Sequence, residues 1–132
     1  MITGRCECGS IQYQVDGEIN DFSHCHCSQC RRLHGAAFAS YGGVARKDFS
    51  YTSKTDDVAS YYSSLSHARI FCRNCGSNIM VELESEPDDY YLALGTVDGD
   101  LALPPGYHIY VGSKASWHSI SDSLPKYDTE PD

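Results

Sequence analysis

Alternating apolar and polar side chains recur along the chain and predict a series of short β-strands. Residues 9–15 (GSIQYQV) alternate three apolar side chains with two glutamines, which is the period of a strand with one solvated face. We expect this segment to be the first strand, with residues 16–17 (DG) forming the turn that follows it. Residues 19–25 and 38–44 are predicted to be further strands, the latter interrupted by a pair of glycines.

Two more alternating segments predict a β-hairpin in the second half of the chain. Residues 79–83 and 90–94 each place apolar side chains at every second position, and the polar residues 85–89 lie between them. Helical periodicity extends only to short turns, at residues 28–33 and 104–106. The pattern therefore predicts a mainly β fold with short strands and few short helical turns.

The length and composition indicate one domain. A chain of 132 residues and 14.6 kDa, with 41% hydrophobic residues, suits a single domain over residues 1–132. Residues 121–132, rich in Ser, Asp and Pro, are expected to form a loop or a partly disordered tail. The sequence begins without the basic and apolar regions of a secretion signal, and it has no run of about 20 apolar residues. We therefore expect a cytoplasmic protein in a reducing environment, without a membrane partner.

The charge balance argues against one class of partner. Ten Lys and Arg residues against 18 Asp and Glu residues give a formal net charge of −8, which opposes sequence-independent binding to the phosphates of nucleic acids. We therefore expect no nucleic-acid partner. Arg31 and Arg32 form a local basic pair, which indicates either contact with an anionic small molecule or a solvated surface pair.

Seven cysteines in three clusters carry the strongest chemical signal in the sequence. The clusters are C-x-C at residues 6–8, C-x-C-x-x-C at residues 25–30 and C-x-x-C at residues 72–75. A disulfide framework needs an oxidising compartment and an even number of thiols, and neither fits this chain. Cysteines one or two residues apart in a tight turn can instead direct their sulfurs at a single metal ion, so we favour zinc binding.

The seven thiolates divide naturally into a site of four and a site of three. Each short cluster has a glycine directly after its second cysteine, and glycine tolerates the positive φ of a turn that directs backbone amides at sulfur. We predict that the two short clusters form one closed, structural zinc site, through Cys6, Cys8, Cys72 and Cys75. The triplet then forms a second zinc site with one position free for a ligand, through Cys25, Cys27 and Cys30. Spacing alone leaves other partitions open.

Three histidines lie beside the triplet in the sequence. His26 lies between two of the cysteines, and in an extended or tightly turned segment its ring would point away from the side that the sulfurs share. We therefore expect His26 to lie behind the metal site or on the surface rather than to bind the ion. His24 and His34 are better candidates for a general base, because histidine titrates near neutral pH. A surface position without a catalytic role is the alternative for each of them.

Five segments carry a resemblance that spans almost the whole chain. They are residues 4–9 (GRCECG), 25–31 (CHCSQCR), 71–76 (FCRNCG), 108–111 (HIYV) with Lys114 and Trp117, and 122–125 (DSLP). In these segments the chain resembles the glutathione-dependent formaldehyde-activating family, also called the GFA or CENP-V domain family. The resemblance implies an Mss4-like, zinc-stapled β-sheet fold, with a structural zinc on the four-cysteine set and a catalytic zinc on the triplet. We interpret His108 and Trp117 as core residues, and Lys114 as a partner for a substrate carboxylate or an ordinary surface lysine.

The activity implied by this resemblance is the condensation of glutathione with formaldehyde to S-(hydroxymethyl)glutathione, run in either direction as a carbon–sulfur lyase. An open zinc site suits this reaction, since a thiol at the fourth position loses its proton and the metal can polarise a carbonyl oxygen. The expected cofactor is Zn²⁺, two ions per chain, and the expected partner is a small-molecule thiol such as glutathione. The expected catalytic residues act through the open zinc and are Cys25, Cys27 and Cys30.

Two other functional classes stay open at this point. In the first, both zinc ions only stabilise a binding or scaffold module, and small thiols never reach the second metal. The second is a zinc-ribbon nucleic-acid binder, which would need a basic face that an acidic chain does not readily supply. The sequence does not predict the oligomeric state.

Overall fold

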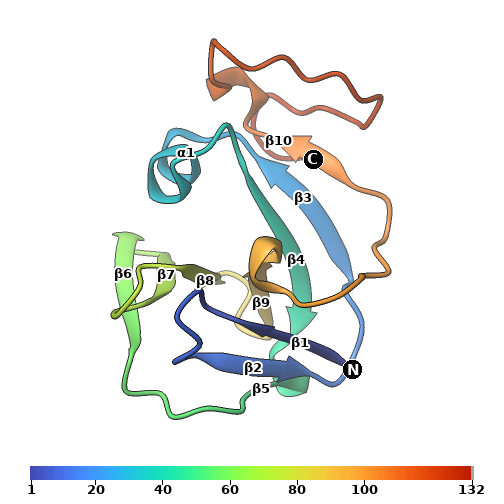
Figure 1. Ribbon diagram of the computed structural model, residues 1–132. Helices are drawn as coiled ribbons and strands as arrows, with labels where there is room; N and C mark the ends of the chain where they lie inside the picture. Colours follow the sequence, from blue (N-terminus) through green and yellow to red (C-terminus); the bar gives the residue numbers. More distant parts are fainter. Residues whose placement is uncertain (132) are drawn as a thin grey trace.

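Short strands dominate residues 1–131, which are the residues that the computed structural model describes (Figure 1). The strands are β1 (Ile2–Arg5), β2 (Gln12–Val15), β3 (Asp21–Cys25), β4 (Ala39–Ala45), β5 (Phe49–Tyr51), β6 (Val58–Ser64), β7 (His67–Cys72), β8 (Asn78–Leu83), β9 (Asp89–Ala93) and β10 (Tyr107–Ile109). The helical elements are α1 (Ser28–His34) and the 3₁₀ turns η1 (Arg46–Asp48), η2 (Leu94–Thr96) and η3 (Val111–Ser113). Strands outweigh helices, which confirms the predicted mainly β fold. Within the described residues, no helix is long and apolar enough to cross a bilayer.

The strands form two open sheets. A three-stranded antiparallel sheet has the order β1-β2-β5. A seven-stranded sheet has the order β10-β3-β4-β9-β8-β7-β6, and its neighbours are antiparallel except β10, which runs parallel to β3. Figure 1 shows β10 and β3 at one end of the large sheet and the β6-β7 hairpin at the other, with α1 above the hairpin. This arrangement places α1 beside strands that are distant from it in the sequence.

Four predicted strands and one predicted helical turn are confirmed. The predicted segment 19–25 contains β3, the predicted segment 38–44 overlaps β4 in all but its last residue, and the two strands pair with each other. The predicted hairpin is formed by β8 and β9, in which Met80 lies opposite Leu92. The predicted turn at residues 28–33 is α1, which ends at a glycine in the left-handed conformation.

Three features differ from the prediction. The segment 9–15 contains β2 rather than the first strand, because β1 precedes it; the four residues of β1 (ITGR) are too few to show an alternating pattern. Residues 104–106 form no helical turn and lead into β10, since two successive prolines remove amide donors from that segment. The sequence pattern also misses the β6-β7 hairpin, where the exposed Tyr61 and Tyr62 break the alternation.

The main hydrophobic core lies between the small sheet and one face of the large sheet. Tyr13 of β2 belongs to the same buried cluster as Val44 and Leu92 of the large sheet. Cys6 and Cys72 are part of this cluster too, and both are almost completely buried. One of the two predicted metal sites therefore lies at the edge of the main core.

A second, smaller buried cluster lies against the opposite face of the large sheet. Leu92 of β9 belongs to the main core, and the adjacent Tyr91 packs against the second cluster, because successive side chains of a strand point to opposite faces of the sheet. Tyr41 of β4 belongs to this second cluster, as do Cys25 and Cys30. The two cysteine sets thus belong to different buried clusters, separated by the large sheet.

The last segment that the structure describes, residues 121–131, is bound to β10 and its surroundings; residue 132 of the predicted tail lies outside the described residues. Residues 121–131 contain no helix or strand, in agreement with the predicted loop. His108 of β10 donates its amide to the carbonyl of Pro125 and accepts the amide of Tyr127 at its own carbonyl. Figure 1 shows this last segment running back beside β10. The loop is therefore attached to the sheet by backbone hydrogen bonds.

Gly4 offers a test of the packing between β1 and the core. Gly4 is buried, and a Cβ at this position would lie 2.6 Å from the carbonyl oxygen of Thr96 and would also meet the ring of Tyr13. Gly4→Ala should therefore destabilise the fold by about 1–3 kcal/mol, the usual cost of overpacking. Gly95→Ala is the control, because nothing lies within 4 Å of its Cβ, and it should change stability by about 0.5 kcal/mol or less. Equal midpoints of urea denaturation for the two variants would contradict this packing.

Candidate metal centre

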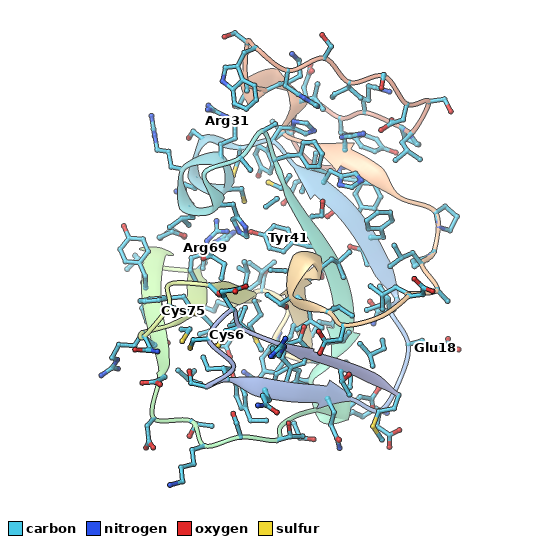
Figure 2. The ribbon with its side chains drawn as sticks, viewed as in Figure 1. Cys6, Glu18, Arg31, Tyr41, Arg69 and Cys75 are labelled. Atoms are coloured by element: carbon cyan, nitrogen blue, oxygen red, sulfur yellow. The ribbon has the colours of Figure 1, made fainter. Side chains whose placement is uncertain are left out.

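Four cysteine sulfurs from two distant segments converge on one point. Cys6 and Cys8 follow β1, while Cys72 ends β7 and Cys75 lies in the turn after it. Their Sγ atoms all lie within 4.8 Å of one another, with 3.6 Å between Cys6 and Cys8 and 3.8 Å between Cys8 and Cys72. Four sulfurs at about 2.3 Å from a tetrahedral zinc ion are about 3.8 Å apart, so this set could hold such an ion. Figure 2 shows Cys6 and Cys75 together beside the small sheet.

The two cysteine pairs lie in similar turns. Gly9 and Gly76 have φ values of 80° and 81°, which confirms the positive φ expected of the glycine after each pair. The Cys72 sulfur accepts the amide of Cys75 at 3.5 Å, and the Cys6 sulfur accepts a backbone amide at 3.3 Å. Amides that donate to sulfur stabilise the thiolate form, which is the form that binds metal.

Serine hydroxyls and burial act on these thiols in opposite directions. Ser77 Oγ lies 3.2 Å from the Cys75 sulfur and lowers the pKa of that thiol to about 6. Ser10 Oγ lies 3.2 Å from the Cys8 sulfur and lowers its pKa as well. Burial raises the pKa of the Cys72 thiol. Part of the set is therefore easily ionised, and the buried part needs a nearby cation to become a thiolate.

The triplet lies where β3 ends and α1 begins. Cys25 is the last residue of β3, Cys27 is the N-cap of α1, and Cys30 is in the first turn of the helix. The Cys27 sulfur caps the helix by accepting the amide of Cys30 at 3.3 Å. The three Sγ atoms lie within 4.8 Å of one another, so this set could also hold a metal ion. The structure therefore brings the seven sulfurs together in the expected groups of four and three.

The three sulfurs of the triplet compete for one negative charge. Hydrogen bonds from the Cys25 and Cys30 thiols lower the pKa of the Cys27 thiol, and the charge of Arg69 adds to this effect. The same hydrogen bonds raise the pKa of the Cys25 thiol, because they require it to keep its proton. All three can therefore become thiolates only when a cation lies among them.

A cavity of about 790 Å³ opens beside the triplet and is lined by all three of its cysteines. None of the four cysteines of the other set lines it. Tyr41 lies where the cavity meets the triplet, with its hydroxyl oxygen 3.4 Å from the Cys30 sulfur. Burial raises the pKa of Tyr41, so its hydroxyl stays protonated and can donate a hydrogen bond. The triplet is thus the cysteine set that a small molecule in the main cavity would reach.

Arg69 of β7 completes the wall of the cavity next to the triplet. Its Nη1 lies 3.4 Å from the Cys30 sulfur and 3.1 Å from the Tyr41 hydroxyl. Its Nη2 donates to the side-chain oxygen of Gln29 at 3.2 Å, and its Nε donates to the hydroxyl of Ser63 at 3.0 Å. Figure 2 shows Arg69 and Tyr41 pointing toward each other across the middle of the molecule. The guanidinium therefore joins α1 to the β6-β7 hairpin.

Elsewhere the cavity wall is acidic. Four carboxylate side chains line it: Asp21, Glu86, Asp89 and Glu130. The Tyr107 hydroxyl donates to Asp21 at 2.8 Å, and the Tyr91 hydroxyl donates to Glu86 at 2.9 Å. A ligand in the cavity would therefore meet a guanidinium beside the sulfurs and carboxylates on the other walls.

Comparison with known proteins identifies the family. The profile of the glutathione-dependent formaldehyde-activating enzymes matches residues 1–113. The chain belongs to this family. The resemblance carried by the cysteine segments is therefore confirmed.

Two curated relatives carry related names. A lyase of Schizosaccharomyces pombe, itself uncharacterised, is 28% identical over 89 residues, which are 67% of this chain and 63% of the relative. A protein of Podospora anserina, named as a proposed glutathione-dependent formaldehyde-activating enzyme, is 32% identical over 107 residues, which are 80% of this chain and 49% of the relative. The chain thus spans between about half and just under two thirds of the length of these relatives.

A solved structure supports the fold of this family member. The crystal structure of a Rhodobacter sphaeroides protein superimposes with a TM-score of 0.62 and covers 74% of this chain and 89% of that chain. The sequence identity is 23%, so the likeness bears on the fold alone.

The structure of this family member places the two general-base candidates outside the cavity wall. His24 Nδ1 lies 2.8 Å from the hydroxyl of Ser40, and His34 Nε2 lies 3.3 Å from the hydroxyl of Tyr41. Burial lowers the pKa of both histidines. His34 therefore reaches the triplet only through Tyr41. Among the described residues, the histidine that lines the cavity is His67, which the sequence did not single out.

His26 belongs to a buried hydrogen-bonded chain that leads away from the triplet. Its Nε2 lies 2.8 Å from Nδ1 of His108, and Nε2 of His108 lies 2.9 Å from the carboxylate of Asp122. Because a carboxylate only accepts, His108 donates from Nε2, and a neutral His108 then accepts from His26 at Nδ1. His26 Nδ1 is left as an acceptor without a partner in residues 1–131, which costs less than an orphaned donor. These hydrogen bonds link the cysteine segment to β10 and to Asp122 in the C-terminal segment.

The remaining cationic candidates do not line the cavity. Arg31 and Arg32 lie on α1, outside the cavity wall. Lys114 donates to the carbonyl oxygen of His118 at 2.6 Å and so stabilises a backbone turn. Trp117 is 72% exposed, which contradicts its interpretation as a core residue, because the turn after η3 carries its side chain into solvent. His108, by contrast, is buried as expected.

Two residues that touch the triplet carry little signal in the sequence. Tyr41 lies beside a pair of glycines in an ordinary strand pattern, and Arg69 lies between Ala68 and Ile70 in β7. A charged side chain between apolar neighbours is the one local hint that Arg69 is buried. The contact itself depends on the register of the sheet, which the local sequence does not contain.

The hydrogen bonds that join His26, His108 and Asp122 predict the tautomer of His26. At pH 7 we expect His26 to carry its proton on Nε2, which lies 2.8 Å from Nδ1 of His108, as detected by long-range ¹H–¹⁵N NMR. Burial lowers the pKa of His26 to about 4, so the folded protein binds no proton there while the unfolded chain binds one below its pKa of 6.5. The stability that this neutral ring contributes should therefore decrease as the pH falls from about 6.5 toward about 4. A proton on His26 Nδ1 at pH 7 would contradict the assignment.

Proposed function

We propose that this chain is a zinc-dependent carbon–sulfur lyase of the glutathione-dependent formaldehyde-activating type, which acts on the adduct of a thiol and an aldehyde. The observation that carries the proposal is the difference between the cysteine sets: three sulfurs converge beside a cavity of about 790 Å³, and the set of four does not reach that cavity. Three thiolates leave a tetrahedral ion one position for another ligand, whereas four thiolates leave none. The family and the names of both relatives support this activity.

In this proposal each cysteine set holds one zinc ion. Soft thiolate ligands select zinc over the harder divalent cations, and the spacing of the four sulfurs fits a tetrahedral ion. The structural zinc would be held by Cys6, Cys8, Cys72 and Cys75. The catalytic zinc would be held by Cys25, Cys27 and Cys30.

The reaction forms or breaks one carbon–sulfur bond. In the forward direction the thiol sulfur bonds to the aldehyde carbon, the carbon–oxygen double bond becomes a single bond, and the proton of the thiol ends on the oxygen. A zinc ion at the triplet supplies the acidity that makes a thiol ionise or a carbonyl more electrophilic. The chain itself confines the two reactants in the cavity, and Tyr41 and Arg69 hold Cys30 in place.

Glutathione is the thiol that the family name indicates, and we propose it as the substrate to test first. It carries an ammonium group as well as carboxylates, and the acidic walls of the cavity attract only the former. We further propose a reducing compartment such as the cytoplasm, because seven cysteines must stay reduced to bind metal.

The two zinc ions should differ in lability. The purified protein should contain about two zinc ions per chain and keep about one after mild chelation, because a closed four-thiolate site has no position at which a chelator can begin. Metal analysis before and after chelation measures both values. Simultaneous loss of both ions, or a starting content near one, would contradict the partition.

Cysteine variants should separate the two roles. Cys72→Ser should lower the free energy of unfolding by about 3 kcal/mol or more, because a structural zinc site contributes directly to folding. Cys27→Ser should remove the labile metal with a much smaller effect on thermal unfolding. A larger loss of stability in Cys27→Ser than in Cys72→Ser would show that the structural and catalytic assignments are reversed.

Catalysis should appear as a faster approach to equilibrium. The zinc-loaded protein should accelerate exchange between glutathione, formaldehyde and S-(hydroxymethyl)glutathione, as measured by exchange NMR, beyond buffer that contains the same zinc. Cys30→Ser should abolish the acceleration. Trp117→Ala, at an exposed position outside the cavity wall, should preserve it. If the protein binds the thiol but does not accelerate its exchange with any aldehyde tested, it would be a zinc–thiol binding module instead.

A further inference from the structure

Arg69 is a buried cation without a carboxylate partner. Only 5% of its surface is exposed, and among residues 1–131 no carboxylate oxygen lies within 4.0 Å of its side-chain nitrogens. A buried charge is costly unless an opposite charge compensates for it. The neutral side chains around it satisfy its hydrogen bonds but supply no negative charge.

The triplet is the source of negative charge that Arg69 touches. The Cys30 sulfur lies 3.4 Å from Nη1, and the Arg69 charge also acts on the Cys27 thiol. The guanidinium and the thiolates of the triplet therefore compensate for each other, at side chains of which Arg69, Cys25 and Cys30 are almost completely buried.

The charge of the loaded triplet then decides which ligand its free position accepts. Three thiolates and one divalent ion carry a formal charge of −1, which favours a neutral ligand over an anionic sulfur that comes from solution. With Arg69 the local formal charge is zero, and the free position can accept a thiolate. Without Arg69 the charge is −1, and the free position favours a neutral ligand.

We propose that Arg69 is a positioning residue for the lyase: its guanidinium neutralises the metal-loaded triplet and so allows the free position to accept an anionic thiolate. This inference rests on the proposed function, since it requires that the triplet holds a metal ion with a free position. It assigns a role to a residue that lies outside both cysteine sets, on a strand 39 residues away from Cys30 in the sequence.

The test compares an anionic with a neutral ligand on the cobalt-loaded protein. The visible spectrum is titrated with 2-mercaptoethanol, which binds as a thiolate, and separately with imidazole, which binds as a neutral molecule. Arg69→Gln removes the charge and keeps an amide donor. We expect it to weaken thiol binding by about 10–100-fold, the usual effect of a residue that supports a metal ligand, and to change imidazole binding by less than about threefold.

Two further variants separate charge from shape. Arg69→Lys keeps the charge without the planar fork and should retain thiol affinity within about threefold of the wild type. Arg46→Gln is the control, because Arg46 is an exposed arginine paired with Glu82 outside the cavity wall, and it should behave as the wild type. Should Arg69→Gln not fold, Arg69→Lys decides alone: a loss of about tenfold or more in thiol affinity would overturn the charge role.

The outcomes distinguish this inference from the proposed function. Equal loss of thiol and imidazole binding in Arg69→Gln would overturn the inference and make Arg69 a purely structural residue. Unchanged thiol binding in that variant would overturn it as well, while leaving the lyase proposal intact. A wild-type spectrum that responds to neither ligand would overturn the proposed function first, because the triplet would then have no free position.

Discussion

Repulsion between converging sulfur atoms is the constraint on which the rest of this structure depends. Both cysteine sets bring ionisable sulfurs within 4.8 Å of one another, and thiolates at that separation repel strongly in a buried site. Hydrogen-bond donors stabilise some of the thiolates, such as that of Cys27, whereas hydrogen bonds between the thiols raise the pKa of Cys25 and burial raises the pKa of Cys72. All the sulfurs of a set can ionise together only with a cation among them. The strands and turns therefore bring together two sets of sulfurs, each of which could hold a metal ion.

The two places differ in what surrounds them. The four-cysteine set connects the turn after β1 to the end of β7 and shares its buried cysteines with the main core. The triplet lies on the other face of the large sheet, between the end of β3 and the start of α1, and faces the cavity. One set thus links distant parts of the chain, and the other presents its sulfurs where a small molecule can approach. This difference supports the structural role that we propose for the first set and the catalytic role that we propose for the second.

The sequence predicted most of the strands and turns that depend on neighbouring residues, but not the contacts between segments that are distant in the sequence. Alternation located β2, β8 and β9, the segments 19–25 and 38–44 were also predicted to be strands, and the glycine after each cysteine pair predicted the positive φ of Gly9 and Gly76. The same patterns missed β1, which has too few residues, and the β6-β7 hairpin, whose exposed tyrosines break the alternation. They also missed the contact between Arg69 and the triplet. That contact joins β7 to α1 across a seven-stranded sheet, so it depends on strand order, which no local sequence records.

Zinc X-ray absorption of the fully loaded protein, with and without glutathione, would count the sulfur ligands of the two sites. We predict an average of about 3.5 sulfur ligands per zinc without thiol, since one set offers four sulfurs and the other three, and an average of about 4 with glutathione bound. The zinc–sulfur distance should stay near about 2.3 Å in both states. An average of 4 sulfurs that does not change with glutathione would contradict an open second site. An average near 3.5 that glutathione leaves unchanged would contradict its role as a thiol-binding centre.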